Sequence, residues 1–262
     1  MRRFWAGLAA LAVVTAISGT SGAQVLIDED FEGFQLKSYT SPTETSAGVS
    51  KGDGTDWTDE LPAGWSMTFS GPLGNPIEFQ GWRIMDVDSW IATEGNQERG
   101  TWTRGGVGVH GSVILADGDA YDDGTNVDTS LFNSYLKTPT IDLATLVPGS
   151  VVISFDSFWR NEVEQIGVLD VTFDDGANWT TLKKYDSAAL ADGQVIDEQV
   201  SLPVNNPGSG KMAFRFGYIL ASNDWWFAVD NVKVQGQLVP EPAAGVLFSL
   251  ASLGLISMRR RR

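Results

Sequence analysis

Apolar and polar residues alternate with a period of two through the second half of the chain, as expected of half-buried strands. The clearest such segments are Val151–Trp159, Val168–Phe173, Lys211–Leu220 and Phe227–Val234. Short turns rich in Gly and Asp separate them, and the chain between the two ends has no convincing amphipathic helical period. The pattern predicts an all-β fold, specifically an antiparallel jelly-roll β-sandwich.

The first half of the chain is less regular. Residues 38–60 and 94–128 are rich in Ser, Thr, Gly and Asp, and they are predicted to be long surface loops. Loops of that length in a compact domain are usually functional or disordered. We therefore expect a single β domain over 24–238, with its most individual features in these two segments.

Two longer apolar runs interrupt the alternation, one at each end of the chain. At the N-terminus, two arginines precede Phe4–Ile17, and small residues then lead to Ala23 and Gln24. This order predicts a cleavable secretory signal peptide over 1–23, cut by signal peptidase between Ala23 and Gln24. The mature protein is then exported.

The C-terminal segment 239–262 has three parts in a fixed order. They are a proline box, an uncharged apolar run and an arginine cluster: Val239, Pro240, Glu241 and Pro242; Ala243–Met258; Arg259, Arg260, Arg261 and Arg262. The prolines interrupt regular structure, and the 16-residue run can form a transmembrane helix of about 24 Å. That is short for a hydrocarbon core of about 30 Å, so we expect a transient anchor. The arginines predict a cytoplasmic C-terminus.

This tail resembles the PEP-CTERM sorting signal of bacterial exported proteins. The resemblance implies that the Pro-Glu-Pro box is processed by an exosortase, a membrane-embedded transpeptidase-like enzyme. It also implies delivery to the cell surface or the extracellular matrix. A plain membrane anchor is the alternative interpretation of the same segment.

Charge and cysteine content narrow the functional classes. Residues 24–238 carry 12 Lys and Arg against 32 Asp and Glu, so the formal net charge of the body is −20. This argues against binding to nucleic acid or to anionic lipid. The sequence contains no cysteine, which excludes disulfides, zinc–thiolate sites and thiol catalysis. The one histidine, His110, lies in a Gly-rich segment and is expected to be a loop residue.

The segment Thr172–Trp179 fits an Asp-box, Ser/Thr-x-Asp-x-Gly-x-x-Trp. In such a turn Asp174 accepts hydrogen bonds from backbone N–H groups, Gly176 takes a positive φ, and Trp179 packs on the returning strand. We interpret it as a folding device.

Five landmarks in the body occur in a familiar order: Asp28–Gly33, Leu61–Ser66, Ser134–Leu143, Ser154–Asp156 and Trp226–Val232. Together with the Asp-box, they resemble the jelly-roll modules called choice-of-anchor J domains. Those modules are similar to MAM domains and to cleaved-adhesin domains of bacterial surface proteins. The resemblance implies a β-sandwich at a cell surface or in a matrix, and it implies no single ligand or activity.

Asp230 is the strongest candidate metal ligand. It shares strand parity with Val232 and Val234, so we expect it to face inward, where an unpaired carboxylate is costly. Related jelly rolls often bind a structural Ca²⁺ between the first and last strands, which makes Asp30 and Glu32 the expected partners. The alternative is that Asp230 accepts backbone hydrogen bonds without a metal. The acidic segment Asp117–Gly124 lacks the EF-hand pattern and is expected to be a solvated turn.

Tryptophans beside the two predicted loops are candidate sugar-binding residues: Trp82, Trp90 and Trp102. Exposed rings stack on sugars, but tryptophans also fill sandwich cores, as we expect of Trp159, Trp179 and one of Trp225 and Trp226. The carboxylate pairs Asp86/Asp88 and Glu162/Glu164 have the spacing of one strand face, which a solvated surface explains equally well.

These observations predict a noncatalytic adhesion or structural protein of the cell surface or matrix. The expected partners are signal peptidase and an exosortase during export, and extracellular polysaccharide or surface proteins afterwards. Two alternatives stay open. One is a carbohydrate-binding module that uses the loop tryptophans, and the other is a polysaccharide hydrolase.

Overall fold

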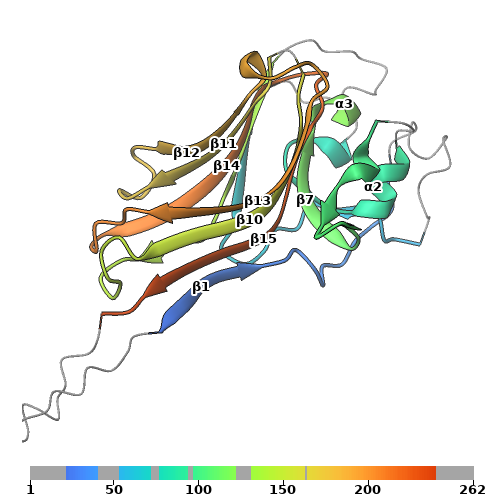
Figure 1. Ribbon diagram of the computed structural model, residues 1–262. Helices are drawn as coiled ribbons and strands as arrows, with labels where there is room; N and C mark the ends of the chain where they lie inside the picture. The colour runs from blue at the N-terminus through green and yellow to red at the C-terminus, as the bar shows by residue number, and fades with distance from the viewer. Residues whose placement is uncertain are drawn as a thin grey trace, which may run out of the picture. The chain divides into compact units, whose positions relative to one another are not determined.

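Two antiparallel β-sheets pack face to face in the protein body (Figure 1). The computed structural model describes residues 22–40, 53–71, 77–93, 97–121, 131–162 and 164–239. One sheet has seven strands in the order β13-β10-β15-β7-β4-β2, with β1 also paired to β15. The other has six strands in the order β12-β11-β14-β8-β3, with β9 paired to β14. The predicted all-β antiparallel sandwich is confirmed.

The strands of the seven-stranded sheet are β1 Ala23–Glu29, β2 Trp57–Thr58, β4 Arg83–Asp86, β7 Ser112–Asp117, β10 Val151–Arg160, β13 Val195–Val204 and β15 Trp226–Gln237. Those of the six-stranded sheet are β3 Ser66–Ser70, β8 Phe132–Lys137, β9 Ile141–Asp142, β11 Ile166–Thr172, β12 Thr180–Asp186 and β14 Lys211–Ala221. A separate hairpin pairs β5 Thr103–Arg104 with β6 Val107–Gly108.

The helical elements are short. They are α2 Val87–Thr93, α3 Gly118–Tyr121, and the 3₁₀ turns η1 Ile77–Phe79, η2 Arg99–Thr101 and η3 Ser187–Ala189. Within the described residues, no helix is long and apolar enough to cross a membrane. The predicted signal peptide up to residue 21, and the sorting residues Pro240–Pro242 and Arg259–Arg262, lie outside the described residues.

Aromatic rings from both sheets fill the space between them. Phe155 of β10 meets Phe216 of β14 with ring centroids 5.1 Å apart, and Phe227 of β15 meets Tyr185 of β12 at 5.3 Å. Trp159 stacks on Tyr185 at 5.6 Å and is fully buried, as predicted. The inner face of β10 is therefore set by its odd-numbered residues.

A β-bulge in β15 changes which face its side chains occupy. Ser154 of β10 pairs with Lys233, but Asp156 pairs with Asp230, so two residues of β15 oppose one of β10. Asn231 occupies the left-handed region with φ 50°. Before the bulge, odd-numbered residues of β15 such as Phe227 face inward. After it, even-numbered residues such as Val234 face inward.

Around Phe158 of β10 and Trp226 of β15, the seven-stranded sheet carries a second apolar layer on its outer face. Trp102 stacks on Phe158 with centroids 5.3 Å apart and planes at 6°, and Trp90 meets Trp226 edge-on at 5.3 Å. Arg99 lies buried in this layer, paired with Asp117 at 2.9 Å. The segment 94–128, predicted as a loop, thus contains the buried strand β7 and a cover for this face, so that prediction is wrong in part.

Candidate functional site: a polar groove across four strands

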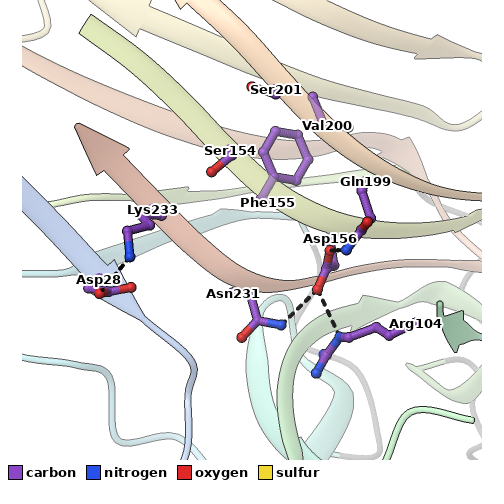
Figure 2. A pocket seen from close by; sticks show the side chains of 10 residues that line it. All are labelled: Asp28, Arg104, Ser154, Phe155, Asp156, Gln199, Val200, Ser201, Asn231 and Lys233. Carbon is purple, nitrogen blue, oxygen red and sulfur yellow. Dashed lines mark hydrogen bonds and ion pairs between the residues drawn. The ribbon is translucent and has the colours of Figure 1, made fainter. Parts of the chain in front are cut away.

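A groove of about 500 Å³ lies on the outer face of the seven-stranded sheet, over β1, β15, β10 and β13. It begins where the second apolar layer ends. Its lining is mostly polar: Asp28, Arg104, Ser154, Phe155, Asp156, Gln199, Val200, Ser201, Asn231 and Lys233 (Figure 2). Gln199, Ser201 and Asn231 are exposed, whereas Asp156 is 6% exposed at the floor.

Asp156 is the centre of the hydrogen-bond network in this groove. Its carboxylate accepts hydrogen bonds from Gln199 Nε2 at 3.0 Å and from Asn231 Nδ2 at 2.7 Å. Arg104 Nε lies 2.8 Å from the same carboxylate, and these three side chains converge on it from three elements (Figure 2). A buried carboxylate needs such partners, because an unpaired one is strongly destabilising.

Arg104 also binds a second carboxylate. Its Nη2 donates to Asp230, the residue opposite Asp156 on β15. A single guanidinium therefore neutralises two facing acids, with side chains 8% and 3% exposed. At the far side of the groove, Lys233 Nζ lies 3.1 Å from Asp28.

The β5–β6 hairpin holds Arg104 in place. Thr103 N and Oγ1 donate to Asp197 of β13, at 2.8 and 3.0 Å. Gly105 and Gly106 turn the chain with φ 58° and 83°, a conformation that glycine adopts without strain. Trp102, the residue before the hairpin, is anchored by its stacking on Phe158. The hairpin therefore forms one wall of the groove.

The bulge at Asn231 builds the site in a way that parity alone does not predict. It places the successive side chains of Asp230 and Asn231 on the same outer face, where both contact groove residues. The prediction that Asp230 faces inward with Val232 and Val234 is wrong for this reason. The sequence signal that could have indicated the bulge is the Asp230-Asn231 pair within an apolar strand, since Asn tolerates positive φ better than most residues.

The predicted Ca²⁺ ligands do not form one cluster. Asp230 pairs with Arg104, and its Oδ1 accepts from Asn231 N at 2.7 Å. Glu32 Oε1 accepts from Ser112 N at 2.9 Å, while Asp30 Oδ1 accepts from Glu32 N at 3.1 Å. Among the described residues, no three acidic or histidine side chains gather closely enough to hold a metal.

The three predicted sugar-binding tryptophans are core residues. Trp82, Trp90 and Trp102 are 0%, 0% and 1% exposed, so their ring faces are not available for stacking. Trp90 Nε1 donates to Asp117 at 2.7 Å, and Trp82 Nε1 donates to the Ser134 carbonyl at 3.3 Å. The prediction is wrong because Trp82 packs between the two sheets against Phe216 and Phe227, while Trp90 and Trp102 pack in the second apolar layer.

The Asp-box forms as predicted. Asp174 accepts from Asn178 N at 2.9 Å and from Asn178 Nδ2 at 2.7 Å, and these bonds lower the pKa of Asp174 to about 2. Trp179 is half-buried rather than a core residue, and its ring lies 4.3 Å from the Arg215 guanidinium. Arg215 also lies over Tyr135 at 4.1 Å. This stack fixes the hairpin to the outer face of the six-stranded sheet.

The remaining candidate residues lie outside the groove. His110 is exposed, with Nδ1 3.0 Å from Asp88 Oδ1, as expected of a loop histidine. Asp86 accepts from Ser89 N at 2.8 Å at the start of α2 rather than sharing a strand face with Asp88. Asp117 is a buried partner of Arg99 rather than part of a solvated turn.

Glu162, from the second of the predicted carboxylate pairs, has a raised pKa. Burial is the main cause that raises its pKa to about 7, followed by repulsion from nearby carboxylates: Asp224, Asp192 and Asp119. Burial likewise raises the pKa of Asp224. This cluster does not contribute to the groove lining.

Comparison of the sequence with protein-family models and with curated proteins finds no match. Among solved structures, the K3 cleaved adhesin domain of Lys-gingipain from Porphyromonas gingivalis W83 is 16% identical, covering 81% of this chain and 100% of its own, with a TM-score of 0.41. TmCBM61, solved in complex with β-1,4-galactotriose, is 11% identical, covering 67% and 90%, with a TM-score of 0.39.

The Stig cyclase Fisc from Fischerella sp. TAU is 12% identical, covering 83% of this chain and 100% of its own, with a TM-score of 0.44. These neighbours include an adhesin domain, a sugar complex and a cyclase. At such identities and TM-scores, none of them assigns a function to this chain.

Proposed function

We propose that this protein is an exported, noncatalytic binding protein of the jelly-roll class, whose groove binds a neutral, hydroxyl-rich ligand such as extracellular polysaccharide. The observation that carries the proposal is the groove itself, an open, polar surface of hydrogen-bonding side chains on a rigid sheet. Side chains fixed by a β-sheet bind a ligand at low entropic cost.

The charge of the groove favours a neutral ligand. Its two cations, Arg104 and Lys233, are each bound to a carboxylate of the lining, Asp156 and Asp28 respectively. No surplus positive charge is therefore directed at the ligand. A body with a net charge of −20 repels polyanions, which disfavours acidic polysaccharides and nucleic acids.

The hydrogen-bonding groups match hydroxyls. Asn231 and Gln199 each carry an amide with both donor and acceptor atoms, and Ser154 and Ser201 carry hydroxyls. A sugar hydroxyl also donates and accepts, so it pairs with any of these groups. The acidic Asp156 is held by three side chains, which favours a fixed structural role over proton transfer.

Export and processing complete the proposal. We infer that signal peptidase cuts at Ala23–Gln24 and that an exosortase processes the tail at Pro240–Pro242. Ala23 pairs with Gln237, so the proposed N-terminal cut lies where β1 pairs with the end of β15. Mass spectrometry of the native protein tests this, with new termini near these residues expected and an uncut tail contradicting it.

Ligand binding is tested by titrating purified protein with neutral and acidic polysaccharides. We expect binding to a neutral polymer that Asn231→Ala or Gln199→Ala weakens by about tenfold, equivalent to one hydrogen bond of about 1.4 kcal/mol. Gln35→Ala, an exposed glutamine outside the groove, is the matched control. Unchanged binding in both groove variants, or binding to acidic polymers alone, would contradict the proposal.

A further inference from the structure

The strand register arranges the groove side chains in two rows. Asp28 pairs with Lys233, Lys233 with Ser154, and Ser154 with Ser201, which makes a straight line across β1, β15, β10 and β13. Neighbouring strands lie about 4.8 Å apart, so this row is about 14 Å long. Directly paired residues share one face of a sheet, so all four side chains point into the groove.

A second row runs beside the first, two residues further along the strands. Asn231 bonds to Asp156, and Asp156 pairs with Gln199. Two residues along a strand cover about 6.7 Å, which separates the rows by roughly the width of one sugar ring. The β5–β6 hairpin, attached through Thr103 to Asp197, lies beyond the second row and forms the wall.

The rows are open at both ends. Among the described residues, β1 pairs only with β15, and β13 pairs only with β10, so these two strands are the edges of the sheet around Asp28 and Ser201. Asp28 at one end has a side chain that is 64% exposed, and Ser201 at the other end is exposed as well. In Figure 1, β13, β10, β15 and β1 lie in succession across this part of the body.

From this geometry we infer that the groove binds an internal stretch of a linear polysaccharide, which runs across the strands rather than along them. The inference rests on the proposed function and specifies its ligand. A sugar ring in an extended chain advances by about one strand spacing, so a row of about 14 Å holds about three rings. Because both ends are open, the chain continues past each edge and no terminal sugar is required.

Recognition of a chain end would need a different site. A groove that binds a terminal sugar is closed at one end, so that side chains contact hydroxyls absent from internal rings. Here the hairpin wall runs beside the rows, at Asp197, and does not cross them. Ser201 at one end and Asp28 at the other are therefore expected to contact the first and last of the bound rings.

The test is a calorimetric series with gluco-, xylo- and galacto-oligosaccharides of increasing length, together with their polymers. We expect affinity to rise about tenfold per ring up to the third and then to level off, since each ring adds about 1.4 kcal/mol. Oligosaccharides with both ends blocked, as a methyl glycoside at the reducing end and a methyl ether at the non-reducing end, should bind as well as free ones. Ser201→Ala should weaken binding of the trisaccharide more than that of the disaccharide.

The outcomes separate the two proposals. Affinity that is maximal with a single sugar, or that is lost when the ends are blocked, overturns the internal-chain inference and leaves the proposed function standing. Absence of binding to every neutral polymer and oligosaccharide overturns both. Gln35→Ala should follow the length dependence of the wild type.

Discussion

Asp156 and Asp230 face each other on neighbouring antiparallel strands, with both carboxylates bound to the same guanidinium. Arg104 supplies that guanidinium from a short hairpin that is separate from both sheets. Two acids in direct register repel each other, so the site depends on the cation between them. The groove and the fold of its wall are therefore linked through one ion-pair network.

Arg104→Ala should destabilise the protein by about 1.5–3 kcal/mol, because it leaves two largely buried carboxylates without their charged partner. The measurement is the free energy of unfolding in urea. Lys37→Ala is the control, since its pair with Asp59 is about half exposed and such pairs contribute about 0–1 kcal/mol. Equal effects of the two variants would show that Arg104 does not hold the acids together.

Trp102→Ala should lower stability by about 3–5 kcal/mol, as expected for the loss of a fully buried aromatic side chain. Trp102→Phe keeps the stacking on Phe158 and should cost less. Both effects are read from thermal or urea unfolding. If Trp102→Ala leaves stability unchanged but abolishes glycan binding, then Trp102 is a ligand contact and its assignment to the core is wrong.

Glu162 should make stability depend on pH in the neutral range. Its pKa is raised from 4.5 to about 7 in the folded protein, mainly by burial. The folded state therefore holds the proton more tightly, and its contribution to stability, complete below pH 4.5, is lost as pH rises through about 7.

Glu162→Gln removes that loss, so it should raise the melting temperature at pH 8 and leave it unchanged at pH 4. The exposed Glu60→Gln is the matched control. A Glu162→Gln variant that melts like the wild type at both pH values would contradict the assignment.

Much of the sandwich could be predicted from the alternating pattern. The segments predicted at Val151–Trp159 and Lys211–Leu220 extend by only one residue each in β10 and β14. Strand β7 was missed because Ser112–Asp117 is buried on both faces, so its side chains do not alternate in polarity. Helix α2 has only seven residues, too few for a periodic signal.

The candidate site was predictable only in part. Asp230 was singled out as a costly acid, and it is 2% exposed, but it lies on the outer face and pairs with Arg104. That partner is 126 residues away in sequence, and the hairpin that carries it has no strong local pattern. The rows depend on strand register, which a single bulge at Asn231 shifts, so they could not be derived from parity.

The most direct test of the central claim is the affinity of the purified protein for a neutral linear polysaccharide, measured by calorimetry for the wild type and for Asn231→Ala. The account predicts measurable binding by the wild type and about tenfold weaker binding by the variant, at a temperature where both proteins are folded. Equal affinity of the two proteins, or no binding by the wild type, would contradict the assignment of this groove as the binding site.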